Sequence, residues 1–217
     1  MREVILYTTH YVRNNRVLYM ISAIKKVIDD RVKIEIIKTA NDHELVLKED
    51  SDSSDIEELR IINIPEESFA FTLDYTSTSG SLKNIRLFRK LSCYVSSKNE
   101  DGINKSCDLV IVTRRDDGVK VIVLDLKSKR TSGKRPTIQI ENSILFLNYI
   151  FSLLDFYYKE EMGISINDIK YIKALVTTGP TQKTTVSKRP SNSSDVKKVP
   201  VKATHKKATI RYSSIAA

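Results

Sequence analysis

Two β-branched runs joined by a short turn constrain this chain more than any other feature of its sequence. The runs are Cys107–Thr113 and Val119–Ser128, and the linker between them ends in Asp117-Gly118. Asp-Gly between apolar runs is the strongest short-range signal for a β-hairpin, because these residues tolerate the positive φ angles of its tight turn. The sequence therefore predicts an antiparallel pair of strands in the middle of the chain.

A long helix and a further strand are predicted after the hairpin. From Thr137 to Met162, apolar residues recur at three- and four-residue steps, and Gly163 follows as a helix-ending glycine. The run Tyr171–Thr178 is apolar and β-branched and predicts a strand. Hairpin, helix and strand in this order predict an α/β fold, with a mixed sheet flanked by helices.

The first hundred residues carry weaker signals. Residues 17–27 have the apolar spacing of a helix. Leu82–Val95 is compatible with either a helix or a strand. Short runs rich in β-branched or aromatic residues predict strands at Val4–Tyr7, Val32–Lys38, Leu45–Leu47, Leu59–Ile64 and Phe69–Tyr75.

The distribution of charge divides the chain. The formal net charge is +9, but the segment from Pro180 onward carries nine Lys or Arg and one acid, which leaves +1 for residues 1–179. We expect one domain over residues 1–179, with its catalytic core at about 100–179, and a basic flexible loop or tail over 180–207. A last strand is expected within 208–217. The basic segment is either a solvated extension or an attachment point for phosphate backbones.

Several classes of protein are disfavoured. The chain has no apolar stretch of the roughly 18 residues that a membrane span needs, and its first residues lack the build of a secretory signal. Cys93 and Cys107 have no paired spacing, so a reducing cytoplasm is the expected compartment and no membrane partner is expected. Scattered histidines and the absence of Gly-rich phosphate loops argue against zinc catalysis and NTP binding.

Three polar residues come together if the hairpin forms. Asp125 and Lys127 are two positions apart on one strand, so their side chains point to the same face, while Leu124 and Leu126 point to the other. Asp108 stands at the start of the partner strand and is expected to lie near residues 125–127. One acid therefore faces another across the hairpin, with a lysine beside them.

This combination suits the hydrolysis of phosphodiesters. Two carboxylates and one main-chain carbonyl, that of Leu126, can hold Mg²⁺ or Mn²⁺, which would also let both acids remain ionised. A cation polarises the phosphate and activates a water, and a lysine neutralises developing charge or helps to deprotonate the water. Gln139, near the start of the predicted helix, is a candidate to orient the water or the lysine.

The arrangement of Asp108, Asp125-Leu126-Lys127 and Gln139 resembles the PD-(D/E)xK nuclease superfamily, which includes restriction endonucleases, Holliday-junction resolvases and phage-defence nucleases. The resemblance covers Cys107 to Thr178. It implies a restriction-endonuclease-like fold, with Asp108 and Asp125 as metal ligands and Lys127 as the catalytic lysine. Cys107 stands where the superfamily often has proline, and Asp125 where glutamate is commoner.

The resemblance also implies partners. DNA is the expected substrate rather than RNA, in restriction or phage defence, and the protein is expected to act as a homodimer or as a subunit of a larger complex. An additional upstream acid is typical of the superfamily, and Glu66, Glu67 and Asp74 are equal candidates for it. The cations that follow the motif are expected to bind nucleic acid: Lys129, Arg130, Lys134 and Arg135.

Other interpretations compete with this one. The tripeptide Asp-x-Lys also occurs at Asp168 and at Asp195, and without the hairpin it indicates only a polar strand end. The chain could instead be a catalytically silent subunit that binds nucleic acid or assembles a complex. A protein-interaction module, with the acid-rich segment Asp42–Glu67 binding a basic partner, is a further alternative.

Overall fold

The computed structural model describes residues 19–40, 42–49, 54–75, 91–92, 102–115, 118–127, 135–162, 168–178 and 195–216. The strand expected at Val4–Tyr7 and most of the ambiguous segment Leu82–Val95 lie outside these residues. Residues 19–27 are helical, as the apolar spacing predicts. Among the described residues, no helix is both long enough and apolar enough to span a lipid bilayer.

The larger of two sheets has six strands and contains the predicted hairpin. Its order is β1-β5-β6-β7-β8-β9. The neighbours from β1 to β7 are antiparallel, and β7, β8 and β9 are parallel to one another. The strands are β1 (Lys33–Ile34), β5 (Ser68–Phe71), β6 (Leu109–Arg115), β7 (Gly118–Lys127), β8 (Ile169–Thr178) and β9 (Val196–Val201).

A smaller, four-stranded sheet lies against the larger one, with the order β10-β4-β3-β2. Its strands are β2 (Ile37–Lys38), β3 (His43–Lys48), β4 (Glu58–Ile62) and β10 (Lys207–Arg211). A short helix, α3 (Tyr212–Ala216), follows β10. A 3-10 turn, η1 (Asp30–Val32), precedes β1, so the expected strand Val32–Lys38 is divided between η1, β1 and β2.

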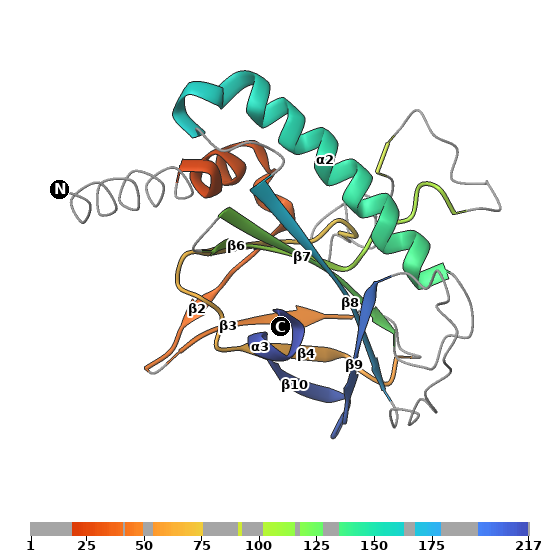
Figure 1. The fold of residues 1–217 in the computed structure, drawn as a ribbon. Helices are drawn as coiled ribbons and strands as arrows, with labels where there is room; N and C mark the ends of the chain where they lie inside the picture. The colour runs from red at the N-terminus through yellow and green to blue at the C-terminus, as the bar shows by residue number, and fades with distance from the viewer. Residues whose placement is uncertain are drawn as a thin grey trace, which may run out of the picture.

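The large sheet is covered on both faces (Figure 1). The long helix α2 (Arg135–Met162) and the helical residues 19–27 pack on one face, where Phe151 and Val121 share a core. The smaller sheet packs on the other face, where Leu45 and Leu124 share a second core. Burial on both sides explains why β6 and β7 have nearly continuous apolar sequences instead of alternating ones. The coarse prediction of an α/β fold with a mixed sheet and a flanking helix is therefore confirmed.

The region expected to be a flexible tail is partly a strand, which corrects the boundary at 180–207. β9 lies inside it and pairs with β8 from Lys173↔Val196 to Thr178↔Val201. The predicted last strand within 208–217 exists as β10, but the chain turns into α3 at Tyr212. Lysines interrupt the apolar pattern of β9, and this is why its sequence resembles a solvated tail.

The first residue of β7, Gly118, fits closely against Asp168, the residue before β8. A Cβ added to Gly118 would lie 2.5 Å from the carbonyl oxygen of Asp168. Only a glycine allows the two backbones to approach this closely. This contact helps to set the register of β7 and β8, in which Lys127 pairs with Thr177 at the far end.

Candidate active site at the ends of β6 and β7

Asp108 is held against the last residues of β7 by two hydrogen bonds. Its amide donates to the carbonyl of Leu124 over 3.1 Å. Its carboxylate oxygen Oδ2 accepts from the amide of Leu126 over 2.6 Å. Asp108 therefore extends the hairpin ladder by one residue and replaces a main-chain acceptor with its side chain. The predicted proximity of Asp108 to residues 125–127 is present in the structure.

Asp125 and Lys127 form an ion pair on the face of the sheet that α2 covers. The ammonium nitrogen of Lys127 lies 2.9 Å from Oδ1 of Asp125. Asp125 has no exposed surface, whereas the Lys127 side chain is 24% exposed. The pair therefore has a buried acid on the inside and a cation that reaches solvent.

The second carboxylate oxygen of Asp125, Oδ2, is buried and accepts no hydrogen bond from any described residue. The carboxyl group of Asp108 lies close enough to Asp125 for each group to affect the pKa of the other. A shared proton or a cation between the two groups would satisfy this oxygen, since two ionised carboxylates can only accept. Leaving such an atom without a partner costs on the order of 1–3 kcal/mol.

The surroundings shift the pKa values of all three side chains. Burial raises the pKa of Asp108 well above its usual range, and the adjacent Asp125 raises it further. Burial also raises the pKa of Asp125, while Lys127 opposes this effect. Burial would lower the pKa of Lys127, but the charges of Asp108 and Asp125 outweigh burial and raise it. Lys127 therefore holds its proton firmly, and one of the two acids holds a proton easily.

A further acid, Glu49, acts on the same group of residues. Its charge raises the pKa values of Asp108, Asp125 and Lys127. It directly follows β3 of the smaller sheet, and its amide donates to the carbonyl of Glu57 over 2.9 Å. Sequence reasoning missed Glu49, because it is one of many acids in the segment 42–67 and no local pattern marks it.

The connection from β3 to β4 reaches the same end of the large sheet. The hydroxyl of Thr178 donates to Oδ2 of Asp55 over 3.4 Å. Thr178 follows Thr177, which pairs with Lys127 across β7 and β8. This contact places the acid-bearing connection beside the strand ends that carry the candidate site.

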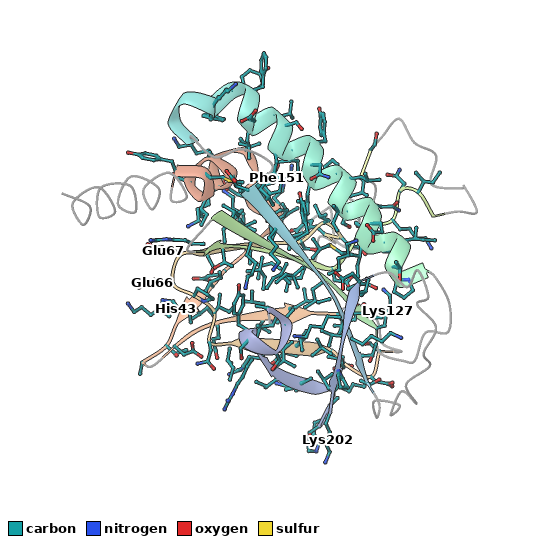
Figure 2. The ribbon with its side chains drawn as sticks, in the orientation of Figure 1. His43, Glu66, Glu67, Lys127, Phe151 and Lys202 are labelled. Atoms are coloured by element: carbon teal, nitrogen blue, oxygen red, sulfur yellow. The ribbon has the colours of Figure 1, made fainter. Side chains whose placement is uncertain are left out.

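Two of the three upstream acids considered from the sequence pair with cations away from the site. Glu66 lies 3.6 Å from the ammonium of Lys38, and Glu67 accepts from Arg114 over 2.7 Å. Figure 2 shows Glu66 and Glu67 on the opposite side of the molecule from Lys127. The amide of Asp74 donates to the hydroxyl of Thr72 over 3.0 Å.

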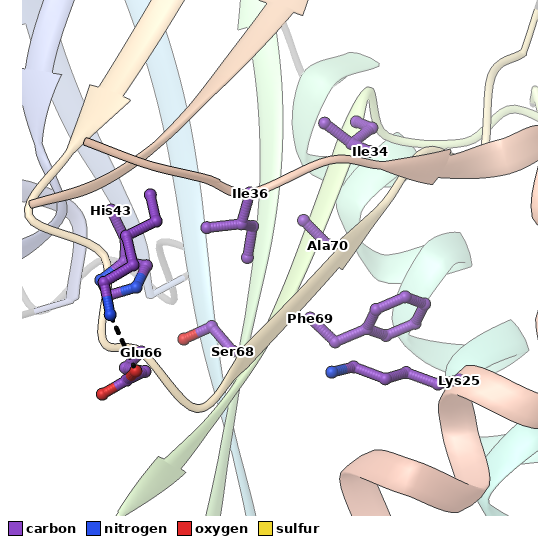
Figure 3. Close-up of a pocket in the computed structure, with 9 residues that line it drawn as sticks. Lys25, Ile34, Ile36, His43, Glu66, Ser68, Phe69 and Ala70 are labelled. Atoms are coloured by element: carbon purple, nitrogen blue, oxygen red, sulfur yellow. Dashed lines mark ion pairs between the residues drawn. The ribbon is translucent and has the colours of Figure 1, made fainter.

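A cavity of ≈ 320 Å³ opens beside Glu66, at the opposite end of β5 from the candidate site. Figure 3 shows its apolar side, formed by Ile36, Phe69 and Ala70, and the ion pair of Glu66 at its rim. The ammonium of Lys25 lies 5.9 Å from the centre of the Phe69 ring. The cavity contains neither of the paired aspartates and is separate from them.

Gln139 contacts the chain just before Asp108, and its role in orienting the water or the lysine stays a prediction. Its side-chain amide donates to the carbonyl of Ser106 over 3.2 Å. One turn later on α2, the hydroxyl of Ser143 accepts from the amide of Cys107 over 2.8 Å and donates to the carbonyl of Gln139. Gln139 and Ser143 therefore fix the segment that carries Asp108, and sequence reasoning did not identify Ser143.

The predicted nucleic-acid contacts fall largely outside the described part of the chain. Lys129, Arg130 and Lys134 are outside the described residues. Arg135 begins α2, but its side chain is not described. The main-chain carbonyl of Leu126 faces the same side of β7 as its amide, toward Asp108, because both groups of a residue point the same way in a strand.

The donor set is compatible with a divalent cation but small. Across the described ranges, no group of three or more His, Cys, Asp or Glu side chains is gathered to hold a metal ion. Asp108 and Asp125 supply two carboxyls, one of them with an unpartnered buried oxygen, and Leu126 supplies a carbonyl. Hard cations such as Mg²⁺ bind through one or two carboxylates and keep several waters, so the residues present fit such an ion.

Comparison of the chain with family sequence profiles, with characterised proteins and with solved structures finds no significant match in any of the three.

Proposed function

We propose that this protein is a Mg²⁺- or Mn²⁺-dependent nuclease of the PD-(D/E)xK type, with Asp108, Asp125 and Lys127 as its reactive group. The observation that carries the proposal is the fully buried Asp125, which is paired with Lys127 and has one oxygen without a donor, beside a second aspartate. A structural ion pair has no need of the second acid, since burying it adds cost. The mixed sheet with α2 on one face is compatible with the restriction-endonuclease-like fold that the resemblance implies.

Each residue has a distinct task under this proposal. Asp108 and Asp125, with the Leu126 carbonyl, would hold the cation, which when bound would polarise the scissile phosphate and lower the pKa of a water. Lys127 keeps its proton and has donors left after its bond to Asp125, so it would neutralise charge that develops on the phosphate. The charges of Asp108 and Asp125 raise the pKa of Lys127, which supports a role for it as a charged donor.

The edge strand β9 offers a contact for the substrate backbone. Asp125, Leu175 and Lys198 pair in one row across three strands, so their side chains share the face that carries Lys127. Two strand spacings separate Lys198 from Asp125 along this row, about 10 Å. The side chain of Lys198 is exposed, and no hydrogen bond or ion pair joins it to a side chain of the described residues. We propose that Lys198 binds a phosphate next to the scissile one, and that the substrate is DNA rather than RNA.

The test is cleavage of plasmid DNA and of single-stranded DNA and RNA, with Mg²⁺, with Mn²⁺ and with EDTA. Asp125→Asn and Lys127→Ala should each abolish metal-dependent cutting. Asp168→Asn and Lys170→Ala are matched controls, because they alter another Asp-x-Lys copy at the opposite end of the same sheet. Cutting that survives in the Asp125 and Lys127 variants would contradict the proposal.

A silent nucleic-acid-binding subunit is the second candidate, and the small number of metal-binding side chains among the described residues is compatible with it. It predicts binding of DNA without cleavage, unaffected by Asp125→Asn. The third alternative, an acidic docking segment at 42–67, finds less support. Several of its acids are already paired with cations of the same sheet, as Glu58 is with Arg60 and Lys207.

A further inference from the structure

The outward face of α2 carries a stripe of large apolar side chains. Leu145 is 69% exposed, Tyr149 is 59% exposed and Phe156 is 78% exposed, and Ser152 lies exposed between the last two. The steps of four, three and four residues place these four side chains in one line along the helix. Tyr157, 71% exposed, widens the stripe at one end and stacks edge-on against Phe156, with 5.0 Å between ring centres.

The opposite face of the same helix is already buried. Ile140, Leu147, Phe151 and Leu154 pack there against the large sheet. A helix that is apolar on both faces is expected to be covered on both, because its second face otherwise stays in water at a cost. In Figure 1, α2 lies on the outside of the molecule, with the sheet on its inner side only.

The stripe has the composition of the centre of a protein interface. From Asn142 to Tyr158 the sequence contains a single charged residue, Asp155. Interface centres are depleted in charge and enriched in Tyr and Phe. This face is not suited to bind a nucleic acid, because the face has no row of cations to contact phosphates.

The size of the stripe suits the centre of a dimer interface. Its four large side chains together expose roughly 500 Å², if the full surface of each aromatic side chain is taken as about 200 Å². This lies at the upper end of the largest apolar patches on monomers, about 300–600 Å². A standard interface covers about 800 Å² per partner including its polar rim, so the stripe would supply its apolar centre.

The order of side chains along the stripe matches a second copy of itself. When two such helices are placed antiparallel, Leu145 lies opposite Phe156 of the partner subunit, and Tyr149 lies opposite Ser152 of the partner subunit. Each large ring then meets a smaller side chain, and the contact repeats on both sides of a twofold axis, as an isologous interface requires. A parallel arrangement would place Tyr149 against itself and leave gaps at Ser152.

We propose that this chain forms a twofold homodimer through the outward face of α2, in the antiparallel register that places Tyr149 opposite Ser152 of the partner subunit. The proposal does not depend on the nuclease activity.

The test is the molar mass of the full chain by sedimentation equilibrium from about 1 µM to 100 µM, a range that covers affinities of weak to moderate dimers. Tyr149→Lys should weaken association at least 100-fold, because it places a charge at the centre of the interface. Ile37→Lys is the matched control, since Ile37 is an exposed isoleucine on another element. Circular dichroism spectra confirm that the variants retain their fold.

A charge-pair rescue tests the register. The double variant Tyr149→Lys/Ser152→Asp should restore the dimer, because each lysine then faces one aspartate of the partner subunit, and the interface contains two such pairs. The proposed interface would be wrong if the wild type were monomeric at all concentrations tested, or if Tyr149→Lys associated as tightly as the wild type. Failure of the double variant to recover association would overturn the antiparallel register.

Discussion

The ammonium nitrogen of Lys127 lies 2.9 Å from Oδ1 of Asp125, two residues earlier on the same strand, and this acid has no exposed surface. Oppositely charged neighbours on one face of a strand often form ion pairs. Most such pairs are exposed to water, where they contribute little to stability. Here one partner is buried, and the hydrogen-bonded segment of Asp108 closes the other side. The charge of the buried Asp125 is therefore stabilised mainly by Lys127.

Removing the lysine alone should destabilise the protein. Lys127→Met leaves the buried Asp125 without its cation, and breaking one side of a buried pair costs on the order of 3–5 kcal/mol. The double variant Lys127→Met/Asp125→Asn should recover most of this loss, because neither residue is then charged. Urea unfolding at neutral pH measures both free energies. Equal destabilisation in the single and double variants would show that the charge of Asp125 is not the cause.

The raised pKa of Asp108 makes stability depend on pH in a defined direction. The folded protein binds this proton more tightly than the unfolded chain, whose aspartates titrate near pH 4. The contribution of Asp108 to the free energy of unfolding should therefore be largest below the unfolded pKa and should fall as pH rises through the folded pKa, by about 1.4 kcal/mol for each unit of separation.

Asp108→Asn should remove this contribution, because the amide does not titrate. Urea unfolding in EDTA, at pH values from about 4 to 8, gives the slope for both proteins. The difference between wild type and variant isolates Asp108 from the other acids. Identical slopes would contradict the shifted pKa.

Cys107 should be inert toward thiol reagents in the folded protein. Burial raises the pKa of its thiol to about 12, so the reactive thiolate is scarce at neutral pH. In a Cys93→Ser background, an aromatic disulfide reagent should label Cys107 only as fast as the protein unfolds. Rapid labelling without urea would show that the segment before Asp108 opens locally.

Under the proposed function, Lys198→Glu should weaken DNA binding and leaves Asp108 and Asp125 unchanged. Measured with the inactive Asp125→Asn variant as background, the dependence of log binding constant on log salt should lose about one phosphate contact. Lys170→Glu carries the same charge change at the opposite end of the adjacent strand and should retain more of the affinity. Equal losses in the two variants would indicate a general charge effect instead of a contact at Lys198.

Local sequence was sufficient for the elements around the candidate site. The Asp117-Gly118 turn and the alternation along β7 predicted the hairpin and the shared face of Asp125 and Lys127, because strand geometry depends on neighbouring residues. The three- and four-residue steps predicted α2 within two residues of its observed start at Arg135. These features are set by the chain's own periodicity.

The burial of Asp125, the position of Glu49 and the place of β9 were decided only by tertiary structure. Asp125 is buried because α2 and the smaller sheet cover both faces of β7, and no pattern inside β7 specifies what packs on it. Glu49 is 76 positions before Asp125 in the sequence, and its charge raises the pKa of Asp125 because the two sheets pack together. β9 has a polar sequence and becomes a strand because β8 presents an open edge to it. Hydrogen bonding and desolvation act between groups that meet in space, and only the assembled fold determines which distant groups meet.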